Sequence, residues 1–188
     1  VAPEFTSEAT FAADENQLAI GTVTATDVEE DAISITVSGS ELAITSDGVL
    51  TFVNAPDYET KTSYTATVNA SDGVNTTEQS ITVNINNLND NDPVFTSSST
   101  LSGDENQTSI ATVTATDADG DSLNYAISGS DLTITTDGVL TFVTEPDYES
   151  VTSFSATITV SDGERTTDQS ITVNVNNLND NAPVYTAA

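Results

Sequence analysis

The sequence predicts an all-β protein built from two tandem β-sandwiches, each with seven strands in a Greek-key arrangement. Three observations support this prediction. The sequence repeats itself once, apolar and polar residues alternate along segments rich in β-branched side chains, and turn-forming dipeptides divide each repeat into short pieces. Seven short strands within about 90 residues are typical of a β-sandwich.

The repeat is visible without any gap in the alignment. "DENQ" begins at residues 14 and 104, "DGVLTFV" at 47 and 137, and "PDYE" at 56 and 146, so each pair is separated by 90 residues. We therefore expect one repeat at 1–90 and a second at 91–188. The stretch "NNLNDNDP" at 86–93 returns as "NNLNDNAP" at 176–183, where we expect the linker to a further repeat that this chain does not contain.

The strands of the first repeat follow from the alternation and the turns. No stretch has helical spacing, and Asp47-Gly48 and Asp72-Gly73 are typical of tight turns. We expect all strands to pair in antiparallel fashion. The predicted strands lie at 4–12, 19–26, 32–38, 41–45, 49–53, 62–70 and 77–87.

Charge and composition exclude several functions. The chain has 188 residues with 30 acidic side chains against two basic ones, Lys61 and Arg165, for a net charge of −28. Such a surface repels nucleic acid and anionic membranes and attracts cations. The absence of Cys and His excludes disulfides, thiol or imidazole zinc sites and Cys or His nucleophiles. No apolar run approaches the roughly 18 residues of a membrane span, so we expect no direct membrane insertion.

Strand direction places the acidic loops. If each strand reverses the direction of the one before, connections fall alternately at the two ends of a repeat. The acidic residues that then meet around the linker are Glu15, Asp57, Glu59 and Asp90 of the first repeat with Asp117, Asp119 and Asp162 of the second. Nothing basic is nearby in sequence, and repulsion at about 4 Å costs on the order of 1 to 4 kcal/mol per pair.

A hard divalent cation would relieve this repulsion. Calcium takes 6 to 8 oxygens from carboxylates, amide side chains, backbone carbonyls and water. The linker supplies the side chains of Asn89 and Asp90 and the carbonyls of Leu88 and Asn91. The charge argument favours two or three Ca²⁺ ions without deciding between these numbers.

Five motifs in this order resemble the cadherin repeat, with its x-E-N, D-R-E, A-x-D, D-x-N-D-N-x-P and D-x-D calcium motifs. They are "DEN", "PDYE", Val68 to Asp72, "NLNDNDP" and Asp117-Ala118-Asp119. The resemblance implies an Ig-like sandwich of cadherin type and three Ca²⁺ between the repeats. It implies that two ions are held by Glu15, Asp57, Glu59, Asp90, the Leu88 carbonyl and Asp119. The third would be held by Asn89, Asp117, Asp119, Asp162 and the Asn91 carbonyl.

This sequence departs from the family pattern at several positions. Tyr58 replaces the Arg of D-R-E, and Asn87 stands where the linker usually begins with Asp. The extra carbonyl ligand after D-x-D has no clear match, although Asp121 or Ser122 could serve. We expect incomplete sites at the outer ends, around Asp27-Val28-Glu29 in the first repeat and, in the second, at Glu105, Asp147, Glu149 and Asp180.

The predicted function is structural. The resemblance, closest to bacterial-type repeats, implies an extracellular calcium-binding module, secreted or on the cell surface. Its ions would stiffen a rod that adheres, aggregates cells or presents other modules, with a homophilic or cell-surface protein partner. The lack of Trp argues against strand-swap adhesion. Asp57 and Glu59 resemble a glycosidase pair, but their recurrence at Asp147 and Glu149 argues for structure, so we expect no enzyme.

The alternative is a module that binds polysaccharide in a calcium-dependent manner. Tyrosines such as those of sugar-binding platforms are present, but we expect them to be core or linker-packing residues. They are Tyr58, Tyr64, Tyr125 and Tyr148.

Overall fold

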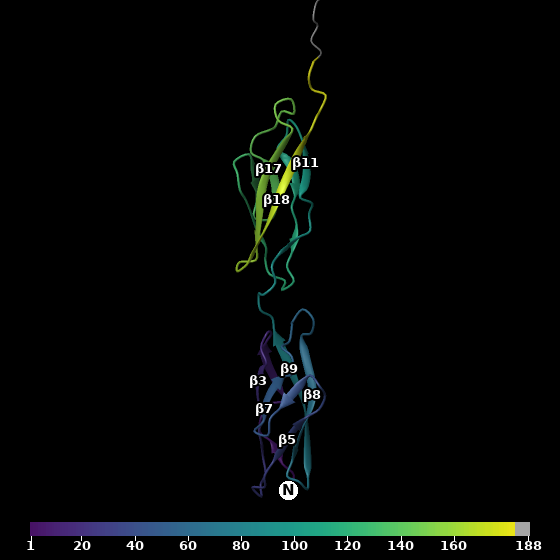
Figure 1. The fold of residues 1–188 in the computed structure, drawn as a ribbon, viewed down its shortest axis with the longest axis vertical. Coiled ribbons are helices and arrows are strands. Elements are labelled where there is room, and N and C mark those ends of the chain that lie inside the picture. The colour runs from purple at the N-terminus through teal and green to yellow at the C-terminus, as the bar shows by residue number, and fades with distance from the viewer. Residues whose placement is uncertain (183–188) are drawn as a thin grey trace, which may run out of the picture. The chain divides into compact units, whose positions relative to one another are not determined.

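The computed structural model describes residues 1–182, which divide into two compact units. Repeat 1 is the unit Val1–Leu88, and repeat 2 is the unit that starts at Asn89 (Figure 1). The described residues form strands, turns and bends but no helix, and so no helix long and apolar enough to cross a membrane. Pro183 to Tyr185, where the sequence predicts the opening of a further repeat, lie outside the described residues.

Repeat 1 contains two facing layers of strands. One sheet has the order β2-β9-β8-β5 and the other the order β3-β7-β6, while β1 and β4 pair in a short ladder. The elements are β1 (Glu4–Phe5), β2 (Thr10–Asp14), β3 (Ala19–Thr22), β4 (Ala25–Thr26), β5 (Ser34–Val37), β6 (Leu42–Ile44), β7 (Val49–Phe52), β8 (Ser63–Ser71) and β9 (Thr76–Asn86). The fold class predicted from the sequence, a seven-stranded Greek-key sandwich, is confirmed.

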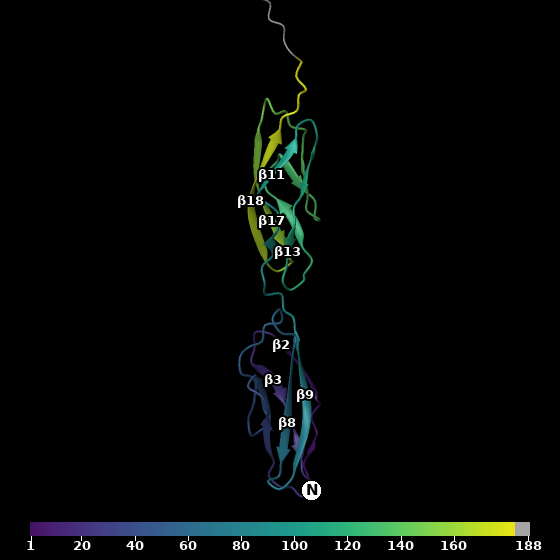
Figure 2. The ribbon, with the colours of Figure 1, turned by 90° about the vertical axis from the view of Figure 1, so that its right-hand side faces the viewer.

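Repeat 2 has the same topology, with sheets of order β11-β18-β17-β14 and β12-β16-β15 and the short pair β10-β13. Figure 2 shows the long strands β17 and β18 beside β11. The elements are β10 (Val94–Phe95), β11 (Thr100–Asp104), β12 (Ser109–Thr112), β13 (Ala115–Thr116), β14 (Asn124–Ile127), β15 (Leu132–Ile134), β16 (Val139–Phe142), β17 (Ser153–Ser161) and β18 (Thr166–Asn176).

The first two predicted strands of repeat 1 are each interrupted. The segment 4–12 changes partner within its length, because Phe5 pairs with Ala25 of β4 whereas Thr10 pairs with Thr82 of β9. The segment 19–26 is broken at Val23, whose N–H donates to the Gly48 carbonyl at 2.8 Å. Each predicted strand is therefore present, and the first two are divided into β1 with β2 and β3 with β4.

The expectation that all strands pair antiparallel is wrong for one pair in each repeat. β2 runs parallel to β9, from Thr10 opposite Thr82 to Asp14 opposite Asn86. β11 and β18 pair in the same way in repeat 2. The first and last strands of an alternating series run in the same direction, so they must be parallel once the sandwich makes them neighbours.

The alternating pattern produces one core per repeat. In β9 the side chains of Ile81, Val83 and Ile85 are buried, and they face Leu50 and Phe52 of the opposite sheet. Burying side chains of this size stabilises a fold by about 1.5 to 3 kcal/mol each. Tyr64 packs edge-on against Phe52, with ring centroids 5.1 Å apart.

All Phe and Tyr side chains within residues 1–182 belong to one of the two cores or pack against it. This group includes Tyr58, Tyr64, Tyr125 and Tyr148, as the sequence predicts. The aromatic rings of the described residues therefore stabilise the sandwiches and form no exposed platform.

Gly48 provides a test of the close approach between Val23, which lies between β3 and β4, and the turn before β7. Its φ is +80°, and an added Cβ would collide with the carbonyl oxygen of Val23, the residue whose N–H donates to the Gly48 carbonyl. We expect Gly48→Ala to lower the free energy of unfolding of repeat 1 by about 2 to 4 kcal/mol in urea denaturation.

Gly73→Ala is the matched control. Gly73 has a similar φ of +91°, but nothing lies within 4 Å of its added Cβ. Only the backbone strain then remains, about 1 kcal/mol. Equal losses for the two variants would contradict the steric interpretation.

Candidate metal centre

A buried carboxylate organises the C-terminal end of repeat 1. Glu15 follows β2 and is only 2% exposed. One carboxylate oxygen accepts the N–H of Tyr58 at 2.7 Å, and the other accepts the N–H of Leu88 at 2.8 Å. Hydrogen bonds to a charged acceptor are stronger than those between neutral groups. Glu15 thus fastens both the loop that carries Asp57 and Glu59 and the chain that leaves β9.

Asp57 and Glu59 lie in the turn that Glu15 holds. The carboxylate of Asp57 accepts the N–H of Thr60 at 3.1 Å and the Thr60 hydroxyl at 3.0 Å. Carboxylate oxygens of Glu59 and Glu15 lie within 4.8 Å of each other. The four predicted site residues of repeat 1, namely Glu15, Asp57, Glu59 and Leu88, are therefore gathered at one end of that repeat.

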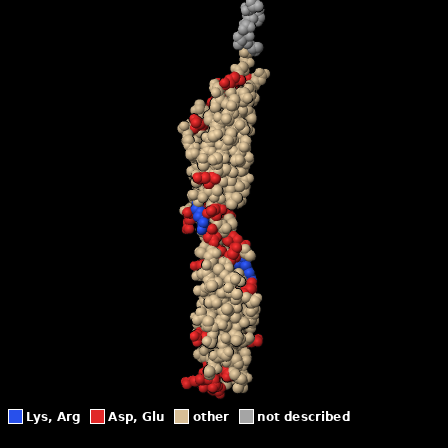
Figure 3. All heavy atoms as spheres, in the orientation of Figure 1, with Lys and Arg blue, Asp and Glu red and all other residues tan. Residues whose placement is uncertain are grey.

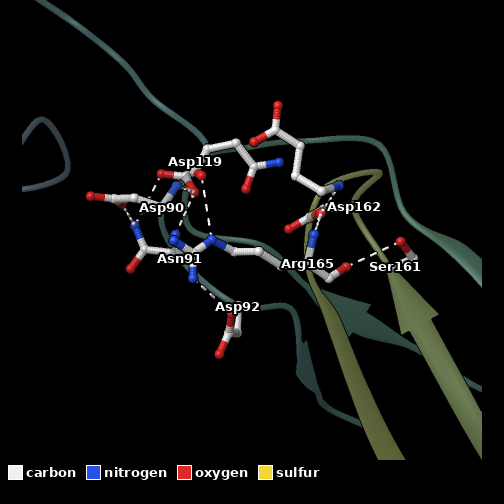
Figure 4. A network of polar contacts seen from close by, with 9 residues as sticks. Asp90, Asn91, Asp92, Asp119, Ser161, Asp162 and Arg165 are labelled. Atoms are coloured by element: carbon white, nitrogen blue, oxygen red, sulfur yellow. Dashed lines mark hydrogen bonds and ion pairs between the residues drawn. The ribbon is translucent and has the colours of Figure 1, made fainter.

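In repeat 2 the residues that follow Leu88 are bonded to the loop after β13. One carboxylate oxygen of Asp119 accepts the N–H of Asp90 at 3.0 Å and the N–H of Asn91 at 2.9 Å. The amide group of Asn91 donates to Asp119 at 3.0 Å and to Asp90 at 2.8 Å (Figure 4). Asp119 thus closes a small ring of polar contacts with the start of its repeat.

The hairpin between β17 and β18 supplies Asp162. Its Oδ1 accepts the N–H of Glu164 at 2.7 Å and that of Arg165 at 2.6 Å. Burial alone would raise the pKa of Asp162, but these two donors and the Asn89 side chain hold its pKa below the usual value. The carboxylate is therefore stabilised in its charged form.

The equivalent carboxylate of repeat 1 has the same arrangement. The backbone N–H and the amide of Asn75, together with the N–H of Val74, lower the pKa of Asp72 to about 2.

Among the predicted ligands in repeat 2, three buried oxygens have no hydrogen-bond donor in the described residues. They are Oδ1 of Asn89, Oδ2 of Asp117 and Oδ2 of Asp162. A buried acceptor without a partner costs about 1 to 3 kcal/mol. All three belong to the set that the resemblance assigns to a single ion, and their donor type is the one that calcium prefers. The residues present therefore fit a calcium ion at this end of repeat 2.

Asp121 adds a fourth carboxylate to this cluster. Oxygens of Asp117, Asp119 and Asp121 all lie within 4.8 Å of one another. Desolvation raises the pKa of Asp121, and the negative charges of Asp117, Asp119 and Asp162 raise it further. From the sequence alone, Asp121 is considered only for the extra carbonyl ligand after D-x-D. In the structure its carboxylate lies beside those of the predicted ligands Asp117 and Asp119.

Arg165 is the residue that sequence reasoning missed. Its Nε donates to the Asn89 carbonyl at 3.4 Å, and its Nη1 pairs with Asp92 at 3.2 Å (Figure 4). The statement that nothing basic is nearby in sequence is therefore wrong. A signal was available, because Arg165 follows Asp162 by three residues in the same tight turn.

Acidic groups also lie at the other end of each repeat. Oxygens of Asp27, Glu29 and Asp31 lie within 4.8 Å of one another in repeat 1, and Oδ2 of Asp27 is buried without a hydrogen-bond donor. In repeat 2 the acidic group at the other end consists of Glu105, Asp147 and Glu149, which are the equivalents of Glu15, Asp57 and Glu59. In Figure 3 the acidic side chains are concentrated near the ends of the repeats, and most of the visible flanks carry none.

Comparison with known proteins shows two kinds of relative. A family model described as a bacterial Ig domain matches residues 89–176. Human protocadherin Fat 1 is 32% identical over 156 residues, which cover 73% of this chain and 3% of that protein. Chitinase A of Pseudoalteromonas piscicida is 30% identical over 154 residues, which cover 80% of this chain and 19% of the enzyme.

The chain is also similar to solved structures of cadherins and protocadherins. The chain matches mouse cadherin-23 EC22-24 with a TM-score of 0.80 and 22% identity, covering 95% of this chain and 68% of that one. It matches human protocadherin-24 EC1-2 with a TM-score of 0.78 and 20% identity, covering 95% and 99% of the two chains.

Both repeats are cadherin-like. They share their fold with the repeats that build cadherin ectodomains, and their sequence likeness extends over most of the chain. The chain spans only 3 to 5% of the length of the curated cadherin relatives that it matches. The activities and partners of those long proteins are therefore not transferred with the fold.

The buried glutamate of the second cadherin-like repeat can be tested by truncation. Glu105 is 1% exposed and accepts the N–H groups of Tyr148 at 2.8 Å and Leu178 at 2.6 Å. We expect Glu105→Ala to lower the free energy of unfolding of repeat 2 by about 2 to 4 kcal/mol, because two partly buried N–H groups lose their charged acceptor. Urea denaturation in chelator measures this loss.

Glu149→Ala is the control for that measurement. Glu149 belongs to the same acidic group but is exposed, and its carboxylate accepts the amide of Asn177 over a long 3.4 Å. We expect a change within about 0.5 kcal/mol. A loss for Glu149→Ala as large as that for Glu105→Ala would show that the acidic group as a whole stabilises the repeat, rather than the buried acceptor.

Proposed function

We propose that this chain is an extracellular calcium-binding repeat module whose ions bind between the C-terminal end of repeat 1 and the N-terminal end of repeat 2. The single observation that carries the proposal is the set of three buried, donorless oxygens on Asn89, Asp117 and Asp162. Each is an oxygen ligand suited to calcium, and no donor among the described residues satisfies it.

The proposed ligands extend the charge argument to both repeats. Two ions are assigned to Glu15, Asp57, Glu59, Asp90, the Leu88 carbonyl and Asp119. A third is assigned to Asn89, Asp117, Asp119, Asp162 and the Asn91 carbonyl. Bound calcium would supply positive charge to a set of carboxylates that otherwise repel one another. The bond from the Leu88 N–H to Glu15 already orients the first peptide group of the linker, which reduces the ordering that binding requires.

The consequence for the chain is mechanical. With calcium the linker is restrained, and without it the like charges repel one another and the linker acts as a hinge. We propose that the module belongs to an extracellular protein in which such repeats stiffen a rod for adhesion or for presenting other modules. Its partner would be a second copy or a cell-surface protein. The repeat boundary after Asp90 is part of this proposal, since it defines where one sequence period ends.

No enzymatic role is proposed. The Asp57 carboxylate is used within its own turn, and the matched region makes up only 19% of the chitinase. Polysaccharide binding remains a prediction, and the packing of the aromatic rings against the cores gives it no support.

Calcium removal tests the proposed function. We expect calorimetric titration to give two or three ions per chain, with dissociation constants of about 0.1 to 1 mM. At 100-fold excess over such a constant, each ion adds about 2.7 kcal/mol to the free energy of unfolding. Small-angle scattering should show a broader range of dimensions in chelator than in calcium. Scattering profiles and melting temperatures that do not respond to calcium would refute the proposal.

Replacing Asp119 tests the ligand assignment. Asp119 is assigned to two ions, so we expect Asp119→Ala to weaken calcium binding at least tenfold in the same titration. Asp168→Ala is the control, because Asp168 lies on β18, is exposed and accepts only the hydroxyl of Thr159 at 2.6 Å among its described contacts. Superimposable titration curves for the two variants would show that the assignment is wrong.

A further inference from the structure

The linker is fastened to each repeat by separate contacts, which lie next to each other in sequence. Leu88 is bonded to Glu15 within repeat 1. Asp90 and Asn91 are bonded to Asp119 within repeat 2, and Asn89 and Asp92 are contacted by Arg165 of the same repeat. Along the chain, these hydrogen bonds change from repeat 1 to repeat 2 between Leu88 and Asn89.

The two contacts on repeat 2 respond differently to calcium. Asp119 is a proposed calcium ligand, so its hydrogen bonds to the linker compete with ion binding. Arg165 contacts the Asn89 carbonyl and the Asp92 carboxylate, neither of which is assigned to an ion. The guanidinium keeps its charge at any ordinary pH and offers several donors in one plane. Its contacts are therefore compatible with both the calcium-bound and the calcium-free linker.

Repeat 1 shows that the hairpin does not need an arginine for its own structure. Asn75 occupies the position equivalent to Arg165, and its side chain turns back to Asp72 at 3.0 Å. Both hairpins keep the same pair of backbone bonds to their aspartate. The arginine thus adds a contact to the linker, while the turn forms equally with asparagine.

We propose that Arg165 is a positioning residue that anchors residues 89–92 on repeat 2 independently of calcium, and so confines the calcium-sensitive hinge to the junction of Leu88 and Asn89. This inference rests on the proposed function only for the hinge, whose position it specifies. The anchor itself does not depend on calcium binding. Losing calcium then frees one junction of the chain, and the whole linker does not become mobile.

The anchor is modest in strength. The side chains of Arg165 and Asp92 are 41% and 64% exposed, so solvent and salt screen their attraction. An exposed pair of this kind changes a local opening equilibrium by about two- to fivefold. This is enough to alter the exchange of a few amide protons without affecting the fold of repeat 2.

Amide hydrogen exchange of the whole chain, followed by NMR in chelator, tests the proposal. We expect Arg165→Asn, which installs the residue of repeat 1, to speed exchange at Asp90 and Asn91 by about two- to fivefold. Amides in the core strands β17 and β18 should keep their protection. Arg165→Lys should restore part of the effect, since it keeps the charge but loses the planar geometry.

Lys61→Asn is the matched control. It makes the same change in net charge at the only other basic residue, which pairs with Glu41 in repeat 1. We expect no change at Asp90 and Asn91.

Three outcomes would overturn the anchor: unchanged exchange in Arg165→Asn, an equal effect of Lys61→Asn, or a general loss of protection throughout repeat 2. A failure of calcium to bind in calorimetry would refute the proposed function but would leave the measurement in chelator unaffected. In calcium, the difference between wild type and Arg165→Asn should shrink, because the ions then restrain the same residues.

Discussion

The buried carboxylate at the end of the second strand is the interaction on which each repeat's C-terminal end depends. Glu15 and Glu105 are almost fully removed from solvent, yet each has two backbone N–H donors at hydrogen-bond distance. Removing a charge from water is costly unless it is hydrogen-bonded in this way. By accepting from the loop before β8 or β17 and from the chain that leaves the last strand, this side chain holds three separate connections of the chain together.

That arrangement explains why so acidic a chain folds. On the face that Figure 3 shows, the negative charge is concentrated near the ends of the repeats. Part of this charge is stabilised locally by N–H donors, as at Asp72 and Asp162. Among the described residues, Asn89, Asp117 and Asp162 keep buried oxygens without donors, and these oxygens are well suited to a divalent cation.

Much of this could be predicted from the sequence, because strands alternate strictly. A period of two identifies strands, and counting them tells at which end of a repeat each loop lies. This reasoning predicted that Glu15 lies at the same end of repeat 1 as the Asp57 loop, and that Asp117 and Asp119 lie together in repeat 2. It could not show that β2 and β9 are neighbours, since alternation gives directions but not spatial order. It also missed Arg165, because the contacts of a long side chain depend on its rotamer and not on strand parity.

The parallel pairing of β2 with β9 determines how each repeat responds to tension. The chain enters a repeat through β1 and β2 and leaves it from the end of β9, at Asn86. Pulling on the two ends therefore slides these strands past each other along their length. The hydrogen bonds of the ladder from Thr10 to Asp14 are then loaded together in shear, where an antiparallel terminal pair would open one bond at a time. Each sandwich is thus closed by the ladder that carries the load.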